Sequence, residues 1–119
     1  MYKYYTYLRV RPVKGNRWEI VDNYSKLGTF IPKGFITNGA DVPRIFWSFF
    51  PPNRSDYFPA VVVHDFMCKD TVDYYELLEA DRELDTNLKR LQVGKVTRFC
   101  MVNACKMWHY FRYKLFKFL

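Results

Sequence analysis

The chain has 119 residues, half of them hydrophobic and a fifth aromatic, and it carries a formal net charge of +7. This length corresponds to one domain, and so many apolar side chains exclude a disordered protein, because their burial offsets the entropy lost on folding. Three cysteines argue against a disulfide scaffold, since one stays unpaired in any monomer. We therefore expect a single domain over residues 1–119.

Neither a membrane anchor nor a secretion signal is expected. No uncharged apolar run approaches the roughly 20 residues that span a bilayer. The first five residues, Met-Tyr-Lys-Tyr-Tyr, lack the apolar stretch of a signal peptide. The expected location is a cytoplasm or a particle assembled there.

The charge is distributed unevenly along the chain. Residues 1–64 carry nine basic and four acidic side chains, residues 65–85 carry two basic and eight acidic ones, and residues 86–119 carry eight basic and no acidic ones. An acidic middle therefore lies between two basic ends.

The first third of the chain is typical of β-strands. Residues 4–11 and 18–21 are rich in aromatic and β-branched side chains, and a Gly-Asn pair between them predicts a hairpin. A third extended segment is predicted at residues 29–31. Glycines and prolines then predict a loop region over residues 37–58.

The hydrophobic period becomes helical after residue 58. A short apolar helix is predicted over residues 60–68, with Pro59 in its first turn. A second helix is predicted from Tyr74 to Leu91, and a third from Lys95 nearly to the end of the chain. Thr71 or Asp73 is the predicted cap of the second helix, and Gly94 its predicted stop.

Strands followed by helices predict an α+β fold. We expect a small antiparallel sheet, made of a hairpin and one further strand, within residues 1–36. Two to three packed helices are expected within residues 59–119.

The adjacent His64 and Asp65 are the first candidate for chemistry. Neighbours on a helix point about 100° apart, so these two side chains cannot bind each other, but both can border one pocket. The imidazole would serve in acid–base chemistry and the carboxylate would hold a cation. Asp81, which follows the small Ala80 on the next predicted helix, is a candidate acceptor that would orient the imidazole. The alternative is a hydrogen-bonded core histidine beside a solvated aspartate.

The loop from Thr37 to Asp41 is the second candidate. Carbonyl groups, the Asn38 amide and the Asp41 carboxylate surround Gly39, and such oxygen ligands suit Ca²⁺. Gly39 also lets backbone approach a ligand closely. The alternative is a plain turn that joins the sheet to the helices.

The other histidine and the cysteines offer weaker candidates. The spacing of Cys68, Cys100 and Cys105 fits no zinc motif, so we expect ordinary buried thiols. His109 is expected on a polar stripe of the last helix and not in a site.

Three separated motifs occur in a recognisable order. They are Pro-x-Gly-Phe-x-Thr-Asn-Gly-Ala-Asp-x-Pro over residues 32–43, Ala60 followed by His64-Asp65, and Ala80-Asp81. Over residues 28–92 this pattern resembles an uncharacterised family that is common in tailed-phage genomes and prophages. The same order is similar to the core of secretory phospholipases of the A-two class.

The resemblance to the phospholipases implies a role for each motif. His64 would be the general base that takes a proton from water attacking an ester. Asp65 and loop oxygens at Asn38, Gly39 and Asp41 would hold Ca²⁺, and Asp81 would accept a hydrogen bond from the other imidazole nitrogen.

The chain departs from these patterns at several positions. Asn38 replaces an Asp of the phage family, Asp41 a Ser, and Cys68 an aromatic residue. Val61 stands where the phospholipases carry a disulfide-forming Cys.

The last predicted helix is basic and aromatic, with six basic and no acidic residues from residue 95 onwards. It could lie on an anionic membrane surface or track a nucleic acid. It could instead form core or a partner interface and pair with the acidic stretch 65–85. We favour the last, and no nucleic-acid motif supports the second.

Two hypotheses about function follow. The first is a phage- or prophage-encoded, metal-assisted esterase that acts on phospholipids in entry or lysis. The alternative is a non-catalytic virion or assembly protein, located in the virion or the host cytoplasm. It would contact itself or phage structural proteins through residues 99–119.

Overall fold

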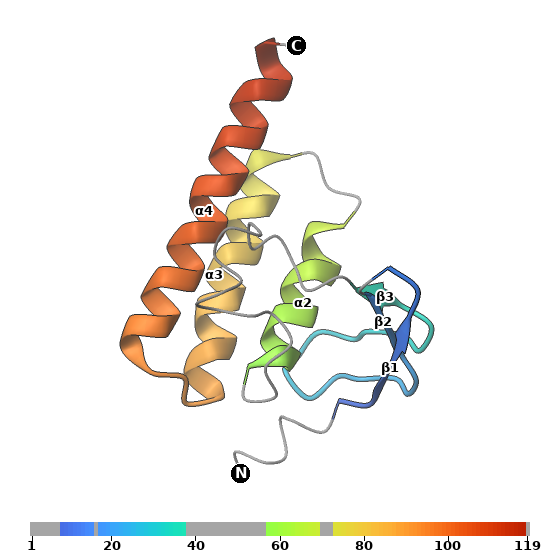
Figure 1. Cartoon of the computed structure of the whole chain (residues 1–119). Helices are drawn as coiled ribbons and strands as arrows, with labels where there is room; N and C mark the ends of the chain where they lie inside the picture. The colour runs from blue at the N-terminus through green and yellow to red at the C-terminus, as the bar shows by residue number, and fades with distance from the viewer. Residues whose placement is uncertain (1–7, 16, 38–56, 70–72, 119) are drawn as a thin grey trace.

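The computed structural model describes residues 8–15, 17–37, 57–69 and 73–118. The long helices α3 (Tyr74–Arg90) and α4 (Lys95–Phe118) run side by side, and α2 (Phe58–Cys68) lies between them and a small antiparallel sheet (Figure 1). The predicted α+β fold is therefore confirmed. The predicted first-strand residues 4–7 lie outside the described part of the chain.

The sheet consists of β1 (Val10–Val13), β2 (Arg17–Ile20) and β3 (Ile36–Thr37) in the order β1-β2-β3. Strands β1 and β2 form the predicted hairpin, in which Val10 pairs with Ile20 and Val13 with Arg17. Gly15 turns the chain between them at a φ of +86°, a backbone conformation that favours glycine.

The prediction of a third strand at residues 29–31 was wrong. In that segment Ile31 makes only an isolated bridge to Tyr24, and the third strand is β3, which ends at Thr37, the first residue of the predicted loop region. Pro32 cannot donate a backbone hydrogen bond, and Gly34 turns the chain at a φ of +93°. Strand pairing therefore resumes only after this turn, where Thr37 lies opposite Trp18 of β2.

Helix α2 (Phe58–Cys68) is the central element of the fold. Pro59 occupies its first turn as predicted, and all seven residues from Phe58 to His64 are buried. One side packs on the sheet region, where Val62 and Val63 meet Ile20. The other side packs on the helices through Ala60 and Val61. Because α2 is covered on two sides, the polar side chain of His64 lies inside the protein.

Helix α3 (Tyr74–Arg90) begins at Asp73, one of the two predicted caps, whose Oδ1 accepts a hydrogen bond from Tyr75 N at 2.9 Å. The predicted stop at Gly94 was wrong. The helix ends at Arg90, and Gln92 adopts a positive φ of 61°. The amides of Gln92 and Val93 bond back to the carbonyls of Lys89 and Leu88, which terminates the helix.

Helix α4 (Lys95–Phe118) runs back along α3, and its last turns extend past the beginning of α3 (Figure 1). Met101, Val102 and Cys105 of α4 pack on Leu84 and Leu88 of α3. Among the described residues, no helix is both long and apolar enough to cross a lipid bilayer.

Candidate functional site

One buried carboxylate, Asp81 of α3, joins the three helices. Its Oδ1 lies 2.7 Å from Nε2 of His64 on α2, and its Oδ2 lies 2.9 Å from Nδ1 of His109 on α4. All three side chains are fully buried. An ionised carboxylate only accepts hydrogen bonds, so each imidazole donates through the nitrogen that faces Asp81. This assignment leaves Nδ1 of His64 and Nε2 of His109 for other partners.

The local sequence explains why His64 is buried and paired. It follows an apolar run that packs on both sides of α2, so its side chain is carried into the interior. A buried polar group without a partner is costly, and Asp81 removes this cost. Ala80, also fully buried, precedes Asp81 on α3. The predicted contact between His64 and Asp81 is therefore present.

The prediction that His109 lies on a polar stripe was wrong. His109 is fully buried and lies on the face of α4 that packs on α3. A spacing of four residues in the sequence could have predicted this burial, because Met101, Cys105 and His109 lie along one side of a helix. Apolar neighbours at this spacing indicate that a histidine points into the core.

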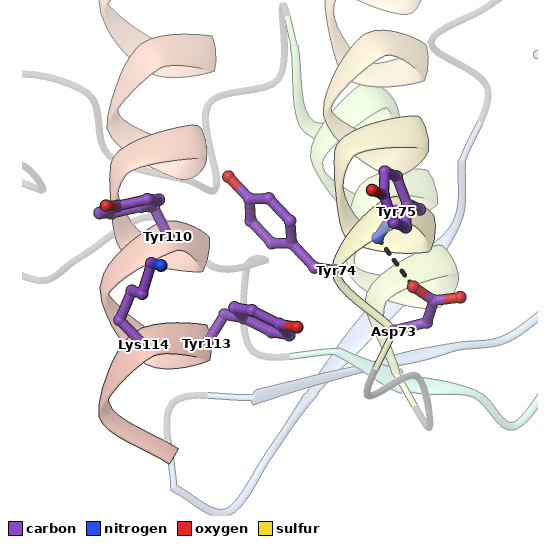
Figure 2. Close-up of a pocket in the computed structure, with 6 residues that line it drawn as sticks. All are labelled: Asp73, Tyr74, Tyr75, Tyr110, Tyr113 and Lys114. Atoms are coloured by element: carbon purple, nitrogen blue, oxygen red, sulfur yellow. Dashed lines mark hydrogen bonds between the residues drawn. The ribbon is translucent and has the colours of Figure 1, made fainter. Parts of the chain in front are cut away.

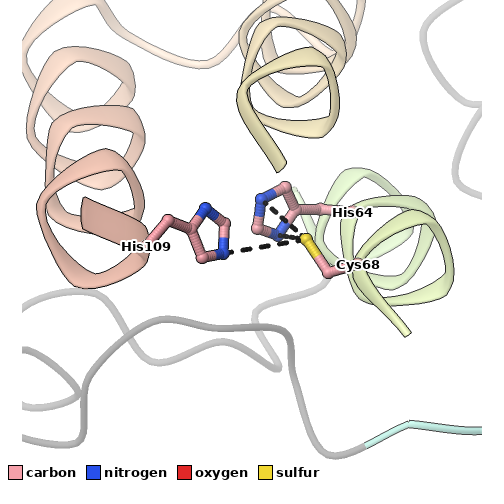
Figure 3. Close-up of side chains that lie close together, drawn as sticks. All are labelled: His64, Cys68 and His109. Carbon is pink, nitrogen blue, oxygen red and sulfur yellow. Dashed lines mark hydrogen bonds between the residues drawn. The ribbon is translucent and has the colours of Figure 1, made fainter. Parts of the chain in front are cut away.

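Cys68 completes a cluster that its sequence spacing did not reveal. Its Sγ lies 3.6 Å from Nε2 of His64 and 3.8 Å from Nε2 of His109. Figure 3 shows the sulfur beside the two imidazole rings, which stack with centroids 5.6 Å apart. His64 and Cys68 are four residues apart on α2, so they share a face. His109 comes from another helix, and only the tertiary fold adds it.

Asp65 points to a different partner. Its Oδ2 accepts a hydrogen bond of 2.7 Å from Oγ1 of Thr37, the buried first residue of the loop predicted to bind Ca²⁺. Asp65 is half-buried, and a carboxylate suits a hard cation. The remaining predicted ligands, Asn38, Gly39 and Asp41, lie outside the described residues.

The cluster shifts the pKa values of both partners in the central pair. Burial lowers the pKa of His64, but the hydrogen bonds and charges of Asp81 and Cys68 outweigh it and raise the pKa from 6.5 to about 9. Burial alone raises the pKa of Asp81, but the hydrogen bonds from His109 and His64 hold it below its usual value. The pair is thus an ion pair near neutral pH.

A separate hollow lies between the start of α3 and the second half of α4 (Figure 2). Its volume is about 430 Å³, and four of its lining residues are tyrosines. The ring of Tyr74 packs against those of Tyr110 and Tyr113. Nζ of Lys114 lies 5.6 Å from the ring centre of Tyr110. Its lining includes no residue of the His64 cluster, so it is a second surface feature.

Comparison with known proteins identifies the family. Residues 18–105 match the model of the family described as "Protein of unknown function (DUF1353)". The chain belongs to the DUF1353 family. The prediction of an uncharacterised family is thereby confirmed. No curated protein and no solved structure matches the chain. The DUF1353 match includes His64, Cys68 and Asp81 but ends before His109, so the second imidazole of the cluster lies beyond the matched segment.

Proposed function

We propose that this DUF1353 protein is a metal-assisted ester hydrolase of a tailed phage or prophage, acting on phospholipid during entry or lysis. The observation that carries the proposal is the buried hydrogen bond of 2.7 Å between His64 Nε2 and Asp81 Oδ1. It holds the imidazole in one orientation and one tautomer, as a general base requires.

In this proposal His64 takes the proton from the attacking water through Nδ1. Asp81 stabilises the imidazolium that results, because its carboxylate already accepts the Nε2 hydrogen. Asp65, together with loop oxygens at Asn38, Gly39 and Asp41, would hold Ca²⁺. The ion would polarise the ester carbonyl and stabilise the oxyanion.

The test is hydrolysis of phospholipid vesicles by the purified full-length protein, with Ca²⁺ or with a chelator. We expect Ca²⁺-dependent release of fatty acid, and a loss of about 10²–10⁴-fold in rate in His64→Ala and in Asp81→Asn, which is the usual contribution of a general base. His64 must be neutral to accept a proton, so the rate should increase with pH towards about 9.

Asp22→Asn is the matched control, since Asp22 is an exposed carboxylate that pairs with Arg9 on the surface. It should leave the rate unchanged. Hydrolysis that survives in His64→Ala would rule out the proposed mechanism.

The exposed face of α4 favours a second candidate, a virion or assembly protein that binds partners through residues 99–119. Phe99 is 69 % exposed and Phe111 53 %, and Val96, Met107 and Tyr110 lie on the same solvent-facing side. Lys114 and the tyrosine-lined hollow adjoin this face. Large exposed apolar patches often mark interaction sites.

Two measurements test this candidate. Sedimentation should detect self-association, or binding to a phage structural protein, that is lost in the double variant Phe99→Ser/Phe111→Ser. Mass spectrometry of purified particles should detect the protein. A strictly monomeric protein that is absent from particles would rule this candidate out.

A further inference from the structure

We propose that His64, Cys68 and His109 form a binding site for one Zn²⁺ ion, with Asp81 as the shared outer acceptor of both imidazoles. Binding of Zn²⁺ goes beyond the proposed hydrolysis and does not depend on it.

The spacing of the ligand atoms fits a zinc ion. One ligand atom from each of the three residues lies within 4.8 Å of the other two. Sγ of Cys68 is 3.8 Å from Nε2 of His109 and 4.0 Å from Nδ1 of His64. Around a tetrahedral zinc with bonds of about 2.0–2.3 Å, neighbouring ligand atoms lie about 3.3–3.6 Å apart. The sulfur contacts therefore need to shorten by only a few tenths of an ångström.

Asp81 supplies the outer shell that zinc-binding histidines require. A histidine that binds a metal through one nitrogen usually donates its other N–H to a carboxylate, which fixes its tautomer. Here both oxygens of Asp81 are used in this way, at 2.7 Å from His64 and 2.9 Å from His109. The proposed site uses the ring nitrogen of each histidine that does not face Asp81, His64 Nδ1 and His109 Nε2, and both lie near Sγ of Cys68.

The donor set selects the class of metal. Two imidazoles and a thiolate suit Zn²⁺ or Co²⁺, whereas Ca²⁺ takes oxygen ligands. This site therefore differs from the one proposed at Asp65. Cys68 is half-buried, whereas His64 and His109 are fully buried. On binding, the Cys68 thiol loses its proton to solvent and its sulfur bonds to the metal.

Zinc binding has a consequence for hydrolysis, and this consequence rests on the proposed function. The metal would occupy Nδ1 of His64, the nitrogen that accepts the proton from water. A bound Zn²⁺ should therefore stop hydrolysis, and a chelator that removes Zn²⁺ should restore it once Ca²⁺ is supplied in excess.

The binding test uses full-length protein freed of metal with a chelator and titrated with Zn²⁺ alone or Co²⁺ alone. We expect one equivalent to bind, a higher melting temperature with Zn²⁺, and, with Co²⁺, a thiolate-to-cobalt charge-transfer band together with visible bands of a four-coordinate ion. Cys68→Ser should lose the charge-transfer band and at least tenfold in affinity. Asp81→Asn should weaken binding about 10–100-fold through the outer shell.

Cys100→Ser is the matched control, because Cys100 is equally half-buried but lies outside the cluster. It should keep the band and the affinity. Circular dichroism of each variant checks that it is folded.

The outcomes separate the two proposals. Absence of stoichiometric binding, or a charge-transfer band that persists in Cys68→Ser, would overturn the zinc site. Zinc binding without any hydrolysis by the zinc-free protein in the presence of Ca²⁺ would leave the zinc site standing and remove the proposed function. Hydrolysis that continues with one equivalent of Zn²⁺ bound would overturn the inhibitory role.

Discussion

Asp81 is the residue on which the interior of this protein depends. Each of its two oxygens pairs with a buried imidazole, one from α2 and one from α4. Removal of one partner from such a buried pair leaves a charge without compensation, which is costly in a low-dielectric interior. The side chains of His64, Asp81 and His109 are therefore coupled, and the effects of substituting two of them on stability are not expected to add.

The pH dependence of stability follows from the central pair in metal-free protein. The raised pKa of His64 contributes stability that is complete below about 6.5 and is lost as the pH rises through about 9. The lowered pKa of Asp81 contributes stability above 3.8 that is lost as the pH falls through its folded value. The contribution of the pair should therefore be largest between these limits.

Urea unfolding at pH 6 and pH 9, with a chelator present, measures this effect. The wild type should lose on the order of a few kcal/mol of unfolding free energy over this interval. His64→Gln should lose clearly less, because its side chain does not titrate. An equal loss in both proteins would show that other groups cause the pH dependence.

At the scale of elements, α3 shows how a helix can end without glycine. Gln92 takes the left-handed conformation after the last turn, with a φ of 61°, where glycine is usual. The hydrogen bonds from Gln92 N and Val93 N, both 3.0 Å, hold it there. An L-residue in this conformation stores about 1–2 kcal/mol of strain.

Gln92→Gly should therefore stabilise the protein. The strain that is relieved is larger than the free-energy cost of the extra entropy that glycine loses on folding. We therefore expect the unfolding free energy, measured with urea, to rise by about 0.5–1 kcal/mol. Gln92→Ala is the control, because Gln92 is exposed and alanine keeps the strain. A gain of the same size in Gln92→Ala would contradict this account of the helix end.

At the scale of the whole molecule, apolar packing contributes more than surface ion pairs to holding the three helices together. Arg98 of α4 does pair with Asp85 of α3 at 3.1 Å, as the opposite charges of their segments predict. Arg90 also reaches back to the Leu27 carbonyl at 2.9 Å. Ion pairs near the surface contribute about 0–1 kcal/mol each. The core cluster around Leu88, which includes residues of all three helices, is therefore expected to dominate.

Leu88→Ala tests this expectation. Leu88 is fully buried in that cluster, and truncation of such a leucine costs about 2–5 kcal/mol. Leu78→Ala on the same helix is the control, since Leu78 is only half-buried and lies outside both core clusters. It should cost less than about 1 kcal/mol, and equal costs in urea unfolding would contradict the central role of the cluster.

The sequence by itself determined the α+β class, the hairpin, the three helices and two of their N-terminal signals. Pro59 and Asp73 act on the backbone within one turn of their own position, so their effects can be predicted from neighbours alone. The pairing of His64 with Asp81 was also predicted, because both belong to motifs with a recognisable order.

Only the tertiary structure decided the third strand, the end of α3 and the membership of the buried cluster. Strand β3 forms because residues 36–37 pair with β2. Gln92, and not the predicted Gly94, takes the left-handed backbone conformation that ends α3 before the chain enters α4. His109 is 28 residues from Asp81 and 41 from Cys68 in the sequence. No local pattern encodes such contacts, since they arise only when α4 packs against α3 and α2.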